Sequence, residues 1–339
     1  VQGDRFVVEP ITLPSNSDRL DRCLETMVEG FRTVIGRLPE QPAAISFAFP
    51  GPADYPRGII GGYLPNFPSF RDGVALKDFL EERFGIPTFI NNYGEALAGA
   101  WPEINARLEA AGSAKRFRNL IGYTWGTGFG VGIVSDNRLH IGDNSCVETF
   151  CLRHKDLPDI NVEEGVSIRA VKRLYAEYAG VDDDTLDPKA IFEIAEGERP
   201  GDADAARRAF ARFGEVAGDA MATAVTLIDG LIVIGGGITA ARKYILPSLL
   251  AEMRGSLHTF SGETLPRVQM KVYDLDDATQ FAAFAQGDSR RIKVYGSDRE
   301  IVYDPQKRIG VMTSHIGASR AISLGAYAFA LNSIDRDAR

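Results

Sequence analysis

The chain has 339 residues, of which 45% are apolar and 25% charged, and these proportions exclude a single small module, a fibrous repeat and a disordered tail. Its formal net charge of −8 argues against nucleic acid and anionic membranes as partners, because both attract clustered lysine and arginine. The length predicts two domains at about 150 residues each. The three cysteines form no disulfide or zinc-knuckle pattern, and no apolar run approaches the ~18 residues of a membrane span, so we expect a cytoplasmic protein.

Short apolar runs alternate with helical stretches along the chain, a pattern typical of an α/β fold. The first expected strand covers 44–49, and the first clear helix ends at Gly85, with Pro87 beyond it. A second helix keeps a 3.6-residue period from 210 to 228. Further strands are expected at 88–90, 120–125, 131–135, 231–234 and 268–272, a hairpin at 292–295 and 300–303, and a last helix at 318–331.

A glycine cluster, 126–132, directly follows the strand expected at 120–125 and leads into the next strand. Strand, glycine turn and strand predict a hairpin whose tip can direct backbone N–H groups at a phosphate, with the hydroxyl of Thr127 as a further donor. The cluster is neither a dinucleotide fingerprint nor a Walker A loop, because no helix or Gly-Lys-Ser/Thr follows. The alternative is a hairpin whose glycines only ease a sharp twist. Gly126, Thr127 and Gly128 are the candidate phosphate contacts.

A second cluster, Gly235, Gly236 and Gly237, follows the strand expected at 231–234 and precedes a helix expected from Ile238. Strand, glycines and helix N-terminus form a favourable approach for an anion or nucleotide, although a plain β–α turn has the same pattern. Taken together, the two clusters predict that a nucleotide lies between them at the mouth of one sheet.

Four passages resemble the ROK family of bacterial sugar kinases and repressors, within the actin-like ATPase superfamily. They are the Pro-Gly-Pro turn at 50–52, the segment 64–68 (Leu-Pro-Asn-Phe-Pro), the first glycine cluster and the stretch 234–238. The resemblance runs from about 44 to 331. It implies a two-lobed actin-like ATPase (ribonuclease H-like) α/β fold with a cleft between the lobes. The smaller lobe would comprise 1–115, completed by the helix 317–335, and the larger lobe 116–316, with an added hairpin segment at 274–312.

The resemblance also implies phosphorylation of a hexose or amino sugar by ATP with Mg²⁺. Asn66, Asn91, Glu148 and Glu163 would bind sugar hydroxyls, which suits planar amides and carboxylates. The first glycine cluster would face the phosphates, and the second would lie near the adenosine. The alternatives are a turn asparagine at 66 and surface glutamates at 148 and 163.

Three positions depart from the family pattern. No phosphate motif on a first strand precedes Val1, and Asn92 stands where the family has its catalytic aspartate. An amide cannot take a proton at neutral pH, and losing a general base typically slows a reaction 10²–10⁴-fold. Asn92 and Glu95 also fit an N-terminal capping box. The third departure is in the zinc cluster of the family, because Cys151 stands where a histidine is usual. We therefore expect a branch of the family without zinc, and no metal ligands.

The first two departures both fall on phosphate or catalytic loops. We therefore expect that segments before Val1 and between Asn92 and Tyr93 are missing from this sequence, and an intact mass of 36.9 kDa would contradict this.

The leading hypothesis is an ATP-dependent sugar kinase that is glucokinase-like, with an aspartate at or beside Asn92 as the base. The alternative is a catalytically silent sugar-binding pseudokinase or a sugar-responsive regulator of the same fold. An actin-like structural ATPase is disfavoured, because the segment around Asn66 would then have no purpose. A homodimer is possible. The segment 274–312 could form an oligomer contact or cover the cleft, although a solvated ribbon is the simpler interpretation.

Overall fold

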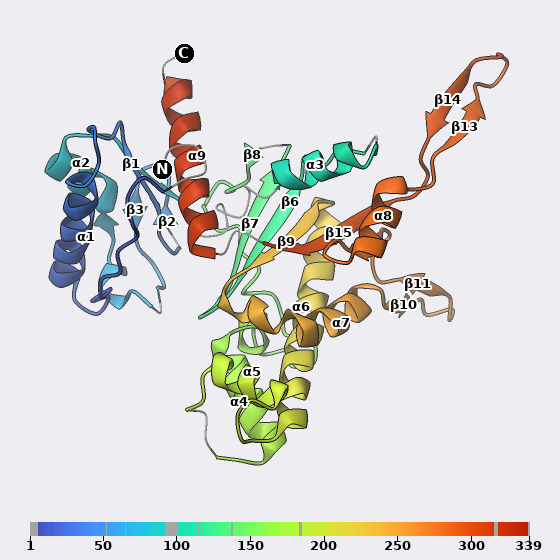
Figure 1. Ribbon diagram of the computed structural model, residues 1–339, viewed down its shortest axis with the longest axis horizontal. Helices are drawn as coiled ribbons and strands as arrows, with labels where there is room; N and C mark the ends of the chain where they lie inside the picture. The colour runs from blue at the N-terminus through green and yellow to red at the C-terminus, as the bar shows by residue number, and fades with distance from the viewer. Residues whose placement is uncertain are drawn as a thin grey trace.

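The computed structural model describes residues 6–51, 53–64, 66–91, 101–113, 115–136, 138–182, 185–314 and 318–337. The chain forms a smaller lobe around a parallel strand pair and a larger lobe around a six-stranded sheet (Figure 1).

The smaller lobe is built on β1 (Ile45–Ala48) and β5 (Thr88–Asn91), which pair in parallel. Alternate strand residues point to opposite faces. Phe47 and Ile90 pack against α1 (Leu20–Ile35) and α2 (Leu76–Phe84), which close one face. The C-terminal helix α9 (Ala318–Asp337) covers the other face, where the Ser46 hydroxyl donates to the Ala326 carbonyl and the ring of Phe89 meets that of Phe329. The last helix therefore returns to the first strands.

A small antiparallel sheet extends this lobe. It comprises β2 (Ala53–Asp54), β3 (Ile59–Ile60) and β4 (Val74–Ala75), with a 3₁₀ turn η1 (Pro68–Phe70) between the last two. Helix α2 ends where the sequence predicts, because Gly85 takes the left-handed conformation (φ +68°) that favours glycine.

The larger lobe has one mixed sheet in which β9 (Leu231–Gly235) is central and fully buried. Its side chains alternate, with Ile232 and Ile234 facing one apolar cluster and Leu231 and Val233 facing another. The sheet order is β12 (Lys271–Asp274), β15 (Arg308–Thr313), β9, β6 (Leu120–Trp125), β7 (Phe129–Ser135) and β8 (Arg138–Leu139).

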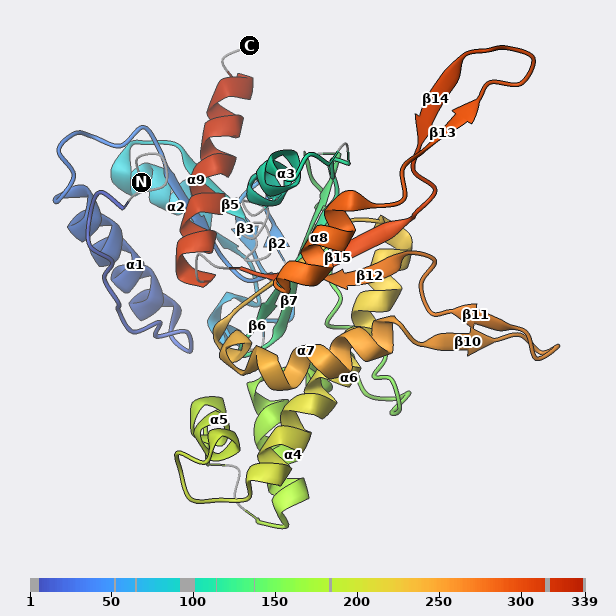
Figure 2. The same ribbon diagram turned by 45° about the vertical axis from the view of Figure 1, so that its right-hand side comes forward.

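Helices cover both faces of this sheet (Figure 2). The first face carries α6 (Ala203–Ile228) and α7 (Arg242–Met253), with α4 (Ile168–Ala179), α5 (Pro188–Glu196) and the 3₁₀ turn η3 (Val162–Gly165) packed beyond them. The second face carries α3 (Trp101–Ala110) and α8 (Ala278–Gln286). Ile104 and Leu108 of α3 share an apolar cluster with Leu120 and Leu231 of the main sheet. Helix α3 therefore packs on the sheet of the larger lobe although it precedes the predicted lobe boundary at 115/116, and that boundary stays a prediction.

Several element boundaries differ from those expected, and three of these differences bear on the fold. The strand expected at 268–272 begins at Lys271, because Val268 is buried in the α6 cluster and Arg267 is held by an ion pair with Asp219 (2.9 Å). The helix expected from Ile238 begins as a 3₁₀ turn η4 (Gly237–Ala241) before α7. The strand expected at 292–295 spans β13 (Arg290–Lys293) instead.

Within the segment 274–312, β15 is a buried strand between β12 and β9. Only the ribbon of β13 and β14 (Glu300–Tyr303) projects, so the addition to the fold is smaller than expected. A second ribbon, β10 (Ser256–His258) with β11 (Thr264–Pro266), projects from the same side of the lobe (Figures 1 and 2). Among the described helices, none is long and apolar enough to cross a membrane.

Candidate functional site

The two glycine clusters meet at one edge of the main sheet. Strands β6 and β9 pair in parallel through to Thr124 and Gly235, so their carboxyl ends lie side by side. The tip of the β6–β7 hairpin, residues 126–128, follows β6, and Gly236 and Gly237 follow β9. The structure thus brings together the two clusters that the sequence places about a hundred residues apart.

Packing within the protein explains two of these glycines. Gly236 has a φ of +101°, and a Cβ built there would lie 2.2 Å from the Trp125 carbonyl oxygen. At Gly128 a Cβ would lie 2.5 Å from Oε2 of Glu163. Gly236 needs glycine because backbone approaches too closely for a side chain, whereas at Gly128 a side chain would displace the carboxylate of Glu163.

Packing does not explain Gly126 and Gly237. Neither has a positive φ, and a built Cβ would meet no described atom within 4 Å. As far as the described residues go, the backbone at both positions therefore faces open space, at the carboxyl ends of two neighbouring parallel strands. Thr127, between Gly126 and Gly128, is exposed. This arrangement leaves room for a ligand to approach the main chain closely, as phosphate sites require.

Glu163, from the turn η3, closes over the hairpin tip. Its Oε2 accepts from the Phe129 N–H (3.0 Å), and its Oε1 accepts from the Arg169 guanidinium (3.2 Å). The same guanidinium donates to the Thr127 carbonyl (3.4 Å) and to Oε1 of Glu164 (2.9 Å). The neighbouring carboxylates raise the pKa of Arg169 through hydrogen bonds, first from Glu164. The tip, Glu163 and Arg169 thus form one network.

Sequence reasoning did not select Arg169. The signal was present, because Arg169 lies in the first turn of α4, where the helix dipole disfavours a cation unless an anionic partner is near. The start of α4 also touches the tip, since the Ile168 N–H donates to the Gly126 carbonyl (2.8 Å).

Asn91 ends β5 in the smaller lobe and is 1% exposed. Its backbone carbonyl accepts from the Phe49 N–H (2.8 Å), whereas its side-chain Nδ2 has no hydrogen-bond partner among the described residues. A buried amide without a partner costs about 1–3 kcal/mol, so this donor is free, among the described residues, for a further acceptor.

The other predicted sugar contacts are more open. Asn66 is exposed in the turn before η1. Glu148 is half-buried in the loop after β8. Asn92 lies outside the described residues. The structure gives no hydrogen bond that joins Asn66 or Asn91 to Glu163 or the hairpin tip, within the described parts of the chain.

A cavity of about 460 Å³ separates the small sheet from the loop after β8. It is lined by Ala53, Asp54, Pro56, Ile59 and Gly61 on one side and by Gly142, Asp143, Asn144 and Ser145 on the other. It therefore lies between the lobes, next to the loop that carries Glu148.

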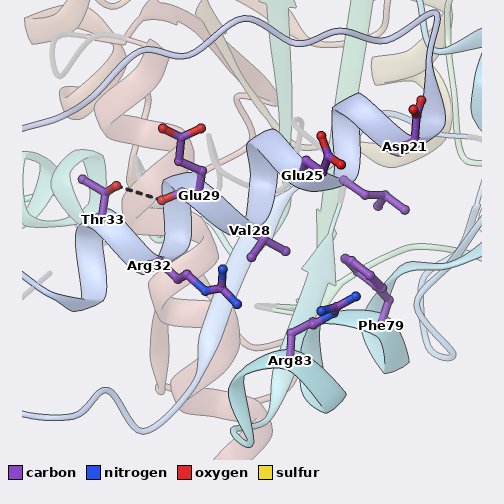
Figure 3. Close-up of a pocket in the computed structure, with 9 residues that line it drawn as sticks. Asp21, Glu25, Val28, Glu29, Arg32, Thr33, Phe79 and Arg83 are labelled. Atoms are coloured by element: carbon purple, nitrogen blue, oxygen red, sulfur yellow. Dashed lines mark hydrogen bonds between the residues drawn. The ribbon is translucent and has the colours of Figure 1, made fainter.

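A larger hollow of about 630 Å³ lies between α1 and α2 (Figure 3). Its charged lining residues are all exposed, and Arg83 stacks on the Phe79 ring (5.4 Å). None of the predicted site residues lines it, and we assign it no ligand. Its charged lining residues are Asp21, Glu25, Glu29, Arg32 and Arg83.

No group of three His, Cys, Asp or Glu side chains in the described ranges is placed to hold a metal ion. Cys146 and Cys151 are exposed free thiols. His154 is 6% exposed, and its Nδ1 accepts from the Asp156 N–H (3.2 Å). Burial, and then the charge of Arg212, lowers the pKa of His154, which favours the neutral ring.

Comparison with known proteins places this geometry in a family. The profile of the ROK family matches residues 10–150. The crystal structure of a glucokinase from Parabacteroides distasonis is 55% identical, with a TM-score of 0.86, and the match covers 98% of this chain and 93% of that one.

Curated relatives match over shorter stretches. A xylose repressor from Bacillus spizizenii is 33% identical over 133 residues, which is 38% of this chain and 31% of the repressor. A beta-glucoside kinase from Klebsiella pneumoniae is 27% identical over 205 residues, 57% of this chain and 63% of the kinase. The chain thus spans about a third of the repressor's length.

The comparisons confirm the two-lobed actin-like fold that the four sequence passages predict. An identity of 55% across almost the whole of both chains shows that the two proteins belong to the same family. The chain belongs to the ROK family, among relatives that include sugar kinases and repressors.

Proposed function

We propose that this protein is an ATP-dependent sugar kinase that phosphorylates a hydroxyl of a hexose or amino sugar. The observation that carries the proposal is the pair Gly126 and Gly237. Both are glycines that the protein's own packing does not require, and they face open space at the ends of β6 and β9. A triphosphate laid against this backbone accounts for them.

On the nucleotide side, the hairpin tip would donate backbone N–H groups and the Thr127 hydroxyl to the phosphates, and the second cluster would lie near the adenosine. Mg²⁺, when bound with the nucleotide, offsets the phosphate charge. We assign no described side chain to it.

On the sugar side, the Asn91 amide would donate to a sugar hydroxyl, which removes the penalty of its unpaired Nδ2. Asn66 and Glu148 would bind further hydroxyls, one from each lobe. Glu163 would bind the sugar while its other contacts hold the phosphate hairpin, so one side chain serves both halves of the site. Transfer needs the two substrates in line, and this link sets their relative position.

The proton of the attacking hydroxyl needs an acceptor. The resemblance assigns that role to the position of Asn92, and an aspartate at or beside it stays a prediction. A protein that holds only Asn92 there would bind sugar without efficient transfer. The xylose repressor relative favours the same alternative, a sugar-binding regulator.

A coupled ADP-release assay over glucose, mannose, fructose and N-acetyl amino sugars tests the proposal. We expect turnover with at least one sugar. Calorimetric sugar binding without turnover would leave the sugar-binding regulator, and the absence of both would overturn the whole proposal.

A matched pair of variants locates the activity. Glu163→Gln and Glu164→Gln each remove one carboxylate that contacts Arg169, but only Glu163 contacts the hairpin tip. We expect turnover to fall about 100-fold in the first variant, because the tip and the sugar lose their shared contact. The second should stay within a few-fold of wild type. Equal losses would argue against the role given to Glu163.

A further inference from the structure

The segment between β8 and η3, residues 140–161, carries both proposed sugar-binding glutamates at or beside it. The structure describes all of this segment and shows no helix or strand in it. Glu148 lies within the segment, and Glu163 is the second residue of η3, directly after it. Side chains that bind one small molecule have to be held at a fixed separation. Contacts other than secondary structure must therefore hold these two carboxylates.

The second part of the segment closes into a loop, residues 152–162. An antiparallel bridge joins Arg153 to Asn161, and the Val162 N–H donates to the Leu152 carbonyl (2.7 Å). These contacts fix the two ends of the 152–162 loop to each other, so the whole loop can be held through its tip.

Each end of the loop leads to one of the two glutamates. The first N–H of the loop donates to the Thr149 carbonyl (3.1 Å), next to Glu148. At the other end, the Asn161 side chain caps η3 by accepting from the Glu164 N–H (3.2 Å), and η3 carries Glu163. A shift of the loop is therefore passed on to both carboxylates.

Ion pairs hold the tip of the loop to two helices. Nζ of Lys155 lies 2.6 Å from Oε1 of Glu215 in α6 and 2.7 Å from Oε2 of Glu252 in α7. Arg212, also in α6, pairs with the other oxygen of Glu215 (2.7 Å) and with Asp156 of the loop. The five charges alternate in sign along this network, from Glu252 to Asp156.

The network differs from an ordinary surface ion pair. The side chains of Lys155, Arg212 and Glu252 are only 19–25% exposed. Burial opposes the charge on Lys155, but its hydrogen bonds to Glu215 and Glu252 outweigh that effect and raise its pKa. Isolated exposed pairs contribute little, whereas a network of close contacts holds its geometry better. Because α6 and α7 pack in the main apolar cluster, the network ties the loop to the core of the lobe.

We propose that Lys155 and Arg212 are positioning residues for the sugar. They act through the 152–162 loop, which sets the separation of Glu148 and Glu163. The inference rests on the proposed function, since it takes both carboxylates as sugar contacts.

The two carboxylates depend on the loop to different degrees. Glu163 is also held at the phosphate hairpin, by the Phe129 N–H and by Arg169. Glu148 lies in the part of the segment that leads into the loop. Release of the loop should therefore weaken sugar binding while nucleotide binding is kept.

The test compares Lys155→Met with the conservative variant Lys155→Arg and with a control at another ion pair. Arg267 is also mostly buried and pairs with Asp219 of α6 (2.9 Å). Arg267→Met thus removes a similar tie to the same helix from a segment outside the loop. Steady-state kinetics with glucose, mannose, fructose and N-acetyl amino sugars gives the KM for sugar and for ATP, and thermal melting gives the stability.

We expect Lys155→Met to raise the KM for sugar about tenfold, as the weakening of one charge-assisted hydrogen bond does, and to leave the KM for ATP within about twofold. Lys155→Arg should bring the KM for sugar back to within about threefold of wild type, because a guanidinium also pairs with two carboxylates. Arg267→Met should lower the melting temperature and change neither KM.

A wild-type KM for sugar in Lys155→Met, or an equal rise in Arg267→Met, would overturn the inference. Asp156→Asn loosens the exposed end of the network and should raise the same KM, so it decides the question if Lys155→Met does not fold. Calorimetry keeps the two proposals apart. A wild type that binds none of these sugars would overturn the proposed function and this inference with it. If wild type binds sugar without turnover, the same comparison of variants is made on the Kd for sugar, and an unchanged Kd in Lys155→Met would overturn the inference alone.

Discussion

Two β-hairpins of the larger lobe have opposite environments. The β6–β7 hairpin lies inside the main sheet, with β9 on one edge and β8 on the other, and all but two of its strand residues from Leu120 to Val134 are buried. The β13–β14 hairpin has no neighbouring strand among the described residues and is exposed throughout. Strand–turn–strand patterns predict both hairpins equally well. Their surroundings differ, because the strands of one are held on both edges by the main sheet while the strands of the other project from the lobe.

The largest effect is expected at the junction behind the buried hairpin. Gly236→Ala forces a side chain into a backbone region open almost only to glycine and against the Trp125 carbonyl, so we expect a loss of about 3 kcal/mol or more in the free energy of unfolding. Denaturant unfolding measures it.

Gly237→Ala is the control for that change. It meets open space at an ordinary φ, so its stability should stay within about 0.5 kcal/mol of wild type. Its nucleotide affinity should nonetheless fall. If Gly237→Ala bound ATP as well as wild type does, the open space would not be the phosphate site.

The second effect compares the two hairpin tips directly. Gly128→Ala displaces the Glu163 carboxylate from the Phe129 N–H, and a misplacement near 1 Å typically costs about 100-fold in rate. Gly296→Ala lies at the turn of the β13–β14 ribbon and meets no atom within 4 Å. Its only expected cost in stability is the strain of a side chain at a φ of +72°.

Initial rates of sugar phosphorylation distinguish the two tips. We expect turnover to fall about 100-fold in Gly128→Ala and to be unchanged in Gly296→Ala. A similar loss of turnover in both variants would mean that the β13–β14 ribbon also contributes to the reaction, which would contradict the proposal that only the β6–β7 hairpin does.

The third effect concerns Arg169, whose guanidinium donates both to Glu163 and to the Thr127 carbonyl of the tip. Arg169→Gln removes a charge-assisted hydrogen bond worth about 1.5–3 kcal/mol, so we expect roughly a tenfold rise in the KM for sugar or ATP. Arg173→Gln is the control, because Arg173 contacts the Glu164 carbonyl and Glu177 but not Glu163. Steady-state kinetics that show the same change in both variants would assign the effect to α4 as a whole.

The sequence was sufficient to predict elements whose residues are buried on both sides. The run 120–125 becomes β6 with those bounds, and β9 exceeds its expected run, 231–234, only by Gly235. In these runs, burial on both faces of the sheet leaves one consistent conformation. Prediction was weaker where tertiary contacts decide the structure, as at Val268, which is apolar because it is buried in the larger apolar cluster and not because it lies in a strand.

The candidate site was predictable only in part. Glycines and asparagines at strand ends are visible in the sequence, so the two clusters and Asn91 could be selected. The contact of Arg169 with Glu163 and Thr127 could not, because it depends on how the start of α4 packs against a tip some forty residues earlier in the chain. Nor could periodicity tell which glycines the protein's own packing requires, since Gly236 and Gly237 are adjacent in the sequence and differ only in the structure, in φ and in what lies opposite them.

The smallest expected effect is on the pH dependence of stability, and it compares a buried histidine of the larger lobe with an exposed histidine of a ribbon. Burial lowers the pKa of His154 below its usual value near 6.5, so the unfolded chain takes up a proton more readily than the folded one. Stability from this group is complete above about pH 6.5 and is lost as the pH falls from there towards the folded pKa, by at most about 1.4 kcal/mol for each unit of separation. His154→Gln should therefore flatten the decrease in melting temperature between pH 7.5 and 5.5. His258→Gln, on the exposed β10 strand, should leave that decrease unchanged. An equal decrease in wild type and His154→Gln would show that other groups, and not this buried ring, set the acid sensitivity of the larger lobe.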